Sequence, residues 1–407
     1  MENLKTSIKS FSFVTAGRLI LRGGNILKTV FVAKILGLTP NEFGLFGIAV
    51  LVAGLIEIIT ETGINVFLLQ EKEPVQKYQD TAWVISIWRG LFIFIIIFLS
   101  APLIATLFHS PQALNLIRLI SLVPLIRGLI HPACISFQKI LRFDSDFYYR
   151  SLIVFIELLF TAIFTLYYRN AYGLVWGLIF SAVFETLLSL LLFRPLPKFI
   201  LDKIQARLIL SRGKFVTAYG IFDYLYTNGD NIIVGLLLGY TALGLYQNAY
   251  RISTLAASET MGIFYKVSLP NFVQISHDKK ALFTASKKYL LPYSLLLIFI
   301  NLVVFFFADF FVHLLLGPAW IMAVPLVKIL SFMGTIRAVT YSFNALFISL
   351  KLQQNVTIIT LTSMTVLLIS LVPFIHLFGL VGAGYSALLA SISALPVTFY
   401  FLKKTHP

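Results

Sequence analysis

Long apolar segments separated by short polar ones run along the whole 407-residue chain. A helix needs roughly 20 mostly apolar residues to cross the hydrocarbon core of a bilayer, and twelve segments meet that length. No alternation with a period of two is visible, so the pattern predicts membrane-spanning helices rather than the strands of a barrel. The predicted spans are residues 11–35, 43–69, 81–108, 114–138, 147–168, 172–193, 213–238, 243–267, 289–316, 322–348, 355–377 and 378–402.

The second half of the chain repeats the first at offsets between 200 and 210 residues. Three pairs of segments match in the same order along the two halves. Each half would therefore contain six spans, and an even number gives both halves the same orientation. We predict an all-α polytopic membrane protein whose two six-helix bundles are related by a pseudo-two-fold axis along the membrane normal. The matching pairs are 32–46 with 234–246, 113–127 with 323–337, and 172–175 with 378–381.

These repeats divide the chain into an N-terminal half (1–197), a basic linker (198–212) and a C-terminal half (213–407). Composition supports a lipid environment, because 58% of the residues are hydrophobic and 12% are charged. The net charge of +15 is concentrated in alternate loops, above all in the segment 194–214, as the positive-inside rule requires. We therefore predict that both termini and the linker are cytoplasmic, and that the charge is topological rather than a sign of nucleic-acid binding.

Several kinds of site are excluded or disfavoured by the sequence. The lone Cys134 cannot form a disulfide within the chain, and it lies in a predicted span. The six histidines show no metal-ligand spacing, and no phosphate-binding loop of the G-x-x-x-x-G-K-[ST] type is present. We expect no catalytic residues, metal or bound cofactor. Net outward transport would then draw either on an H⁺ or Na⁺ gradient or on removal of the transported product outside.

Several motifs, taken in order, resemble a known family. The chain is similar to the bacterial polysaccharide flippases of the multidrug/oligosaccharidyl-lipid/polysaccharide exporter superfamily, closest to the colanic-acid and O-antigen exporter branch. It is shorter than many such proteins, which implies that a terminal helix pair is absent, and Ser349-Leu350-Lys351 lacks a glycine common there. The motifs are Asp230–Tyr250, Glu61–Gln70, Thr81–Ser86, Ala101–Phe108, Phe137–Phe143, Ser268–Phe272 and Gly317–Trp320.

Candidate chemistry lies in charged residues within the predicted spans, because an ionisable group there is costly. Several share one helical face through spacings of four or seven, and Glu157 and Glu185 add further buried carboxylates. We expect a water-filled cavity between the halves, with arginines facing an anionic substrate; the alternative is that these charges pair with one another. The cavity arginines would be Arg18, Arg22, Arg89, Arg127, Arg251 and Arg337, and the coupling or cavity carboxylates Glu57, Glu61, Asp223 and Asp230.

The resemblance implies a monomeric flippase of the bacterial inner membrane. It would move an undecaprenyl-pyrophosphate-linked oligosaccharide to the outer leaflet by alternating access, alongside membrane lipids and other polysaccharide-assembly proteins. A drug or small-cation exporter of the same superfamily is the first alternative, although it predicts an acidic cavity. A multispanning polysaccharide polymerase or ligase is the second, although such an enzyme would carry a sizeable loop outside the membrane, and every outside loop here is short.

Overall fold

The computed structural model describes residues 23–24 and 26–405, and these residues form helices and turns without a strand. Nine of their helices are long and apolar enough to cross a membrane, or ten if the bent pair Ala113–Arg127 and Pro132–Lys139 forms one span. The all-α, multi-pass membrane fold predicted from the sequence is confirmed. Two features account for the remaining spans of the predicted twelve. One 72-residue helix contains two predicted spans, and most of the first span lies outside the described residues.

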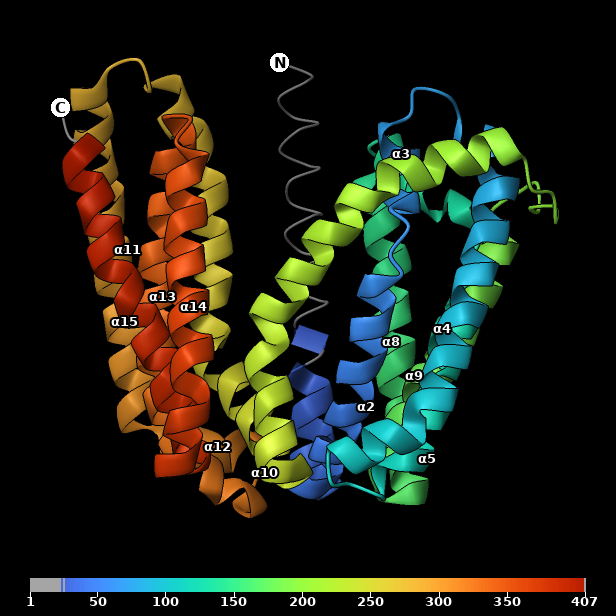
Figure 1. Ribbon diagram of the computed structural model, residues 1–407, viewed down its shortest axis with the longest axis horizontal. Helices are drawn as coiled ribbons and strands as arrows, with labels where there is room; N and C mark the ends of the chain where they lie inside the picture. Colours follow the sequence, from blue (N-terminus) through green and yellow to red (C-terminus); the bar gives the residue numbers. More distant parts are fainter. Residues whose placement is uncertain (1–22, 25, 406–407) are drawn as a thin grey trace. The chain divides into compact units, whose positions relative to one another are not determined.

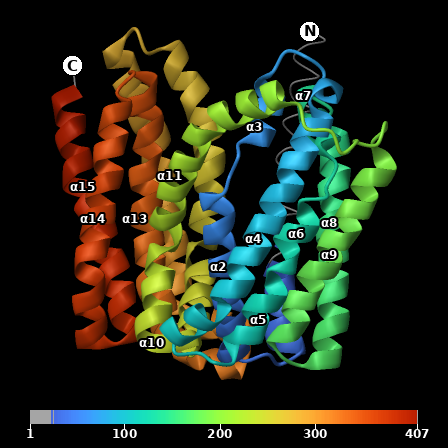
Figure 2. The same cartoon turned by 45° about the vertical axis from the view of Figure 1, so that its right-hand side comes forward.

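The chain forms two compact units, Met1–Asn228 and Gly229–Pro407. In the first unit, α2, α4, α8 and α9 run side by side, while α5 and α3 lie at opposite ends of them (Figures 1 and 2). The elements of this unit are η1 (Phe31–Ile35), α2 (Pro40–Ile59), α3 (Ile64–Gln70), η2 (Val75–Lys77), α4 (Gln79–Leu107), α5 (Ala113–Ile120), α6 (Leu122–Arg127), η3 (Pro132–Ile135), α7 (Ser136–Lys139), α8 (Phe143–Tyr168), α9 (Ala171–Leu192) and the first part of α10 (Lys203–Gln274).

The second unit contains the rest of α10 and a bundle in which α11, α13, α14 and α15 lie side by side (Figures 1 and 2). Within it α13 packs against both α11 and α15, and α14 packs along α15. Its further elements are α11 (Lys279–Phe306), α12 (Ala308–Leu315), η4 (Pro318–Ala323), α13 (Val324–Ser349), α14 (Gln353–Phe378) and α15 (Leu380–Thr405).

Helix α2 begins at a reciprocal cap that its sequence specifies. The Glu42 carboxylate accepts a hydrogen bond from the Thr39 backbone N–H at 3.0 Å and another from its hydroxyl, and Pro40 occupies the first helical position. The predicted span 43–69 ends early, at Ile59, because Gly63 adopts φ +64° and turns the chain into the short helix α3. A Cβ on Gly63 would lie 2.8 Å from Cα of Gly213, so α10 approaches this turn at two glycines.

Left-handed residues recur at equivalent positions of the two halves. Gly37 and Gly239 have φ of +73° and +79°, and Gly239 interrupts α10 between the two predicted spans. Leu141 and Lys351, which are 210 residues apart (351 − 141), have φ of +58° and +61° although neither is a glycine. The turn in which the sequence lacks a glycine therefore adopts the left-handed conformation with a lysine. Matched backbone strain at the matched positions supports the duplication.

Candidate functional site

In the first unit, α2 and α4 bring together the first cluster of predicted site residues. The Arg89 guanidinium donates to the Glu57 backbone carbonyl at 2.7 Å and to the Glu61 carboxylate at 3.1 Å. The other Glu61 carboxylate oxygen accepts from the Gly63 backbone N–H at 2.9 Å, which fixes its orientation. We call Glu57, Glu61 and Arg89 the Arg89 cluster. Its ion pair ties α4 to the turn that follows α2, near Gly63.

Two glycines position the arginines on α4 and at the end of α6. A Cβ on Gly90 would lie 2.6 Å from the Pro124 carbonyl oxygen, and a Cβ on Gly128 would lie 2.8 Å from the Ser86 carbonyl oxygen. The two backbones therefore touch where each helix carries an Arg-Gly pair, Arg89-Gly90 and Arg127-Gly128. Such close contacts between small residues are the usual way in which membrane helices pack. The contact fixes the base of both arginine side chains.

Arg127 and Lys28 each have a carboxylate partner on a neighbouring helix. Arg127 Nε lies 4.0 Å from the Glu185 carboxylate on α9, and the Arg127 side chain remains 43% exposed, compared with 25% for Arg89. Lys28 donates to Glu157 on α8. Lys28 was not singled out from the sequence. These pairs agree with the alternative that charges in the spans pair with one another.

In the second unit, α10 and α13 hold a different arrangement, built through tyrosines. Asp230 is 5% exposed, and its carboxylate accepts from the Tyr246 hydroxyl at 2.9 Å and from the Asn231 backbone N–H at 2.8 Å. The rings of Tyr246 and Tyr250 lie 6.2 Å apart. The Arg337 guanidinium then donates to the Tyr250 hydroxyl at 2.6 Å. We call Asp230, Tyr246, Tyr250 and Arg337 the Asp230 network.

The turn at Gly239 makes this network possible, because it folds α10 back so that Asp230 meets a residue sixteen positions later. Tyr246 and Tyr250 are not among the charged residues that the sequence singles out. Their hydrogen bonds to a carboxylate and a guanidinium could not be found from helical spacing, since the pairing crosses a break in the helix. The relevant signal was Asp230 at the head of the repeated motif.

The other predicted site residues have less defined surroundings. Arg18 and Arg22 lie outside the described residues. Glu57 contributes its backbone carbonyl to the Arg89 cluster. Asp223 is exposed on the first part of α10, and Arg251 directly follows Tyr250. That the whole set lines one cavity stays a prediction. Among the described residues, no group of three or more His, Cys, Asp and Glu side chains could hold a metal ion.

The chain is similar to several proteins of surface-polysaccharide assembly. It is 26% identical to the teichuronic acid biosynthesis protein TuaB of Bacillus subtilis over 69% of this chain and 59% of TuaB. It is 22% identical to the lipopolysaccharide biosynthesis protein WzxC of Escherichia coli over 79% of this chain and 65% of WzxC. The matches thus span about three fifths of the length of these two relatives.

Solved structures of membrane transporters share the fold. The lipid II flippase MurJ, in an inward closed conformation, superposes with a TM-score of 0.74 over 97% of this chain and 87% of MurJ, at 15% identity. A multidrug resistance MATE family transporter in an inward-facing conformation gives a TM-score of 0.61 over 94% of both chains, also at 15% identity. Residues 32–325 match the family described as polysaccharide biosynthesis protein. The resemblance predicted from the motifs is confirmed: the chain belongs to the polysaccharide biosynthesis protein family.

Proposed function

We propose that this chain is a transporter of the bacterial inner membrane that moves a prenyl-pyrophosphate-linked oligosaccharide from the cytoplasmic to the outer leaflet. The observation that carries the proposal is the set of arginines held inside membrane-spanning helices by neighbouring residues, in a polysaccharide biosynthesis protein. A cation at that depth has to be offset by a partner or a function. The names of TuaB and WzxC and the fold of a lipid II flippase support this substrate class.

Arg127 is the best placed of the described first-unit arginines to bind the anionic head of such a lipid. It is more exposed than Arg89, and its 4.0 Å contact with Glu185 is long enough to be exchanged for a phosphate oxygen. A guanidinium offers two parallel N–H donors, which match the geometry of a pyrophosphate. Arg89, with two short hydrogen bonds, instead fixes the helices around it.

Coupling to an ion gradient would use the Asp230 network. Asp230 is a buried carboxylate whose two oxygens are held by Tyr246 and Asn231, and Arg337 lies one tyrosine away. A carboxylate in such a setting can exchange a proton or a sodium ion when its surroundings change from dry to wet. Because the basic loops obey the positive-inside rule, both termini would be cytoplasmic. The transporter would work as a monomer, alongside other polysaccharide-assembly proteins.

The test is transfer of a fluorescent prenyl-pyrophosphate oligosaccharide across vesicles that contain the purified protein. We expect Arg127→Ala to slow transfer roughly ten- to a hundredfold, since a lost charge-assisted contact costs about 1.5–3 kcal/mol. Arg127→Lys should restore part of the transfer rate, because a lysine ammonium keeps the charge but cannot donate the two parallel hydrogen bonds of a guanidinium.

Arg150→Ala is the matched control. Arg150 is 47% exposed, like Arg127, but pairs with Asp146 on its own helix at 3.0 Å, so its loss should leave transfer unchanged. Full transfer by Arg127→Ala would contradict the assignment of this arginine. Vesicles that transport organic cations but not the oligosaccharide lipid would favour the drug exporter instead.

A further inference from the structure

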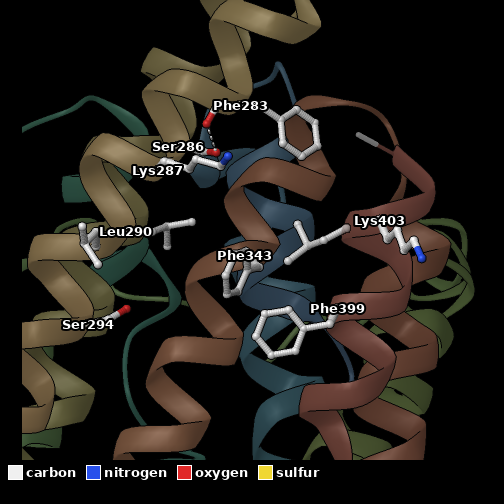
Figure 3. A pocket seen from close by; sticks show the side chains of 10 residues that line it. Phe283, Ser286, Lys287, Leu290, Ser294, Phe343, Phe399 and Lys403 are labelled. Carbon is white, nitrogen blue, oxygen red and sulfur yellow. Dashed lines mark hydrogen bonds between the residues drawn. The ribbon is translucent and has the colours of Figure 1, made fainter. Parts of the chain in front are cut away.

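The second unit contains a cavity of about 830 Å³ between α11, α13 and α15. Helices α11 and α15 both pack on α13, and the space between them is lined by the rings of Phe283, Phe343 and Phe399 and by leucines (Figure 3). This volume is within the range of ligand-binding pockets. The cavity lies wholly within one unit and contains no member of the Asp230 network.

Two lysines stand at one end of this cavity. Lys287 lies in the third turn of α11 and Lys403 in the last turn of α15, and both line the cavity. Lys287 and Ser294, which also lines the cavity, are seven residues apart, or about 10 Å along a helix. The lining therefore combines two cationic side chains with apolar rings and leucines. These two kinds of side chain suit the phosphate and the hydrocarbon chains of a membrane lipid.

The positive charge of the two lysines is not balanced by a nearby carboxylate. No carboxylate lines the cavity, and within the described part of the chain neither lysine has an ion-pair partner within 4.0 Å. The sequence of this unit offers few candidates, since residues 229–407 contain eleven Lys and Arg but four carboxylates, with none after Asp309. The Ser286 hydroxyl is engaged by the Phe283 backbone carbonyl at 2.9 Å.

We propose that this cavity binds an anionic phospholipid of the bilayer, with the headgroup phosphate held by Lys287 and Lys403 and an acyl chain against Phe343 and Phe399. Lysines near a membrane surface each favour anionic lipid, and their stems can lie along apolar surface while the ammonium reaches the headgroup. Phe343, Phe399 and the leucines of the lining supply an apolar wall for a flexible chain.

The lining favours a resident phospholipid over the transported glycan lipid. Recognition of a sugar needs several oriented hydrogen-bonding groups, and recognition of a pyrophosphate is best served by guanidinium forks. The cavity offers two point charges and two serines, one of which is already bonded to its own helix. It also lies at one end of its helices, so it suits a lipid that stays in one leaflet.

Native mass spectrometry of the purified full chain tests the proposal, with added phosphatidylglycerol and phosphatidylcholine of equal chain length. We expect the wild type to retain phosphatidylglycerol through purification and to bind it roughly ten- to thirtyfold more tightly than phosphatidylcholine. The double variant Lys287→Gln/Lys403→Gln should lose that preference. Both lysines are exposed, so the protein should fold normally.

The matched control is Lys279→Gln/Lys280→Gln, which removes the same charge from exposed positions on α11 outside the cavity. It should keep the preference within about twofold. Ser294→Trp should fill the depth of the cavity and reduce binding of both lipids while the lysines remain. Equal loss in both double variants, or a wild type without preference for phosphatidylglycerol, would overturn the site. Preferential binding of a prenyl phosphate, displacing phosphatidylglycerol, would overturn the assigned occupant.

Discussion

The two units share a backbone plan but not their charges. Arg127 and Arg337 are repeat counterparts at an offset of 210 (337 − 127). Arg127 faces the Glu185 carboxylate, whereas the position that corresponds to Glu185 in the second half, at an offset of 206 (391 − 185), is Ser391. Arg337 donates to the Tyr250 hydroxyl. The same helical position therefore supports an ion pair in one unit and a tyrosine contact in the other.

The contrast extends to the repeated motif around Gly37 and Gly239. At their shared offset of 202, Asp230 corresponds to Lys28 (230 − 202), and at an offset of 200 Tyr246 corresponds to Phe46 (246 − 200). Lys28 pairs with Glu157, while Asp230 accepts from Tyr246. The repeat in the first half forms with Lys28 and Phe46 at the corresponding positions, so we infer that the repeated backbone does not by itself require the Asp230 network. A residue set that the scaffold does not need is a better candidate for function.

The largest effect should come from the helix contact after the arginines. Gly128 corresponds to Ala338 in the second half, so the first unit needs a glycine where the second accepts a methyl group. Gly128→Ala would place Cβ 2.8 Å from the Ser86 carbonyl oxygen and should lower the free energy of unfolding by about 1–3 kcal/mol. Ala338→Gly should cost about 1 kcal/mol, the difference in helix propensity.

Thermal unfolding followed by tryptophan fluorescence measures this difference. The Trp83 indole N–H donates to the Leu129 carbonyl at 3.0 Å, next to Gly128, so it reports on the contact between α4 and α6. A Gly128→Ala protein with the melting temperature and Trp83 emission of the wild type would show that the two units do not differ in this contact.

Glycine substitutions at the left-handed turns should have a smaller effect, and this effect should be the same in both units. Leu141 and Lys351 hold left-handed conformations, which cost a non-glycine residue about 1 kcal/mol or more. Leu141→Gly and Lys351→Gly should each stabilise the protein by about 0.5–1 kcal/mol, after the extra chain entropy of glycine. Lys288→Gly, at an exposed helical position on α11, should instead destabilise it by about 1 kcal/mol. Destabilisation by both turn substitutions would refute a shared strain.

The helical class and most of the spans could be predicted, because the hydrocarbon core of a bilayer requires long apolar helices. The matching segments of the two halves also revealed the internal repeat. Gly37 and Gly239 are visible in the sequence since a left-handed turn selects glycine. Leu141 and Lys351 adopt a left-handed conformation although neither is a glycine, so the sequence does not reveal these turns. The break in the predicted span 114–138 was missed for a similar reason: the two helical parts are bent by 74°, but apolar residues continue through the bend.

The candidate site was only partly predictable. Charge inside a span singled out Arg89, Glu61 and Asp230, because such residues are rare in apolar helices. The partners of these residues depend on which helices are neighbours and on the turn at Gly239. Periodicity within one helix predicts neither the neighbours nor the turn. Lys28 was not predicted as a site residue, although it occupies the position that corresponds to Asp230. A comparison of the repeats residue by residue is the signal that would have found it.

The central claim is that Arg127 of the first unit binds the anionic head of the lipid, whereas the Asp230 network couples transport to a gradient. Transfer of the oligosaccharide lipid in vesicles, with imposed or collapsed proton and sodium gradients, tests it in Asp230→Asn and Glu185→Gln side by side. We expect Asp230→Asn, which mimics the protonated carboxyl group, to bind the lipid but transfer it independently of either gradient. Glu185→Gln should keep the dependence of the wild type. Wild-type transfer that ignores both gradients, or an Asp230→Asn protein with unchanged dependence, would contradict the claim.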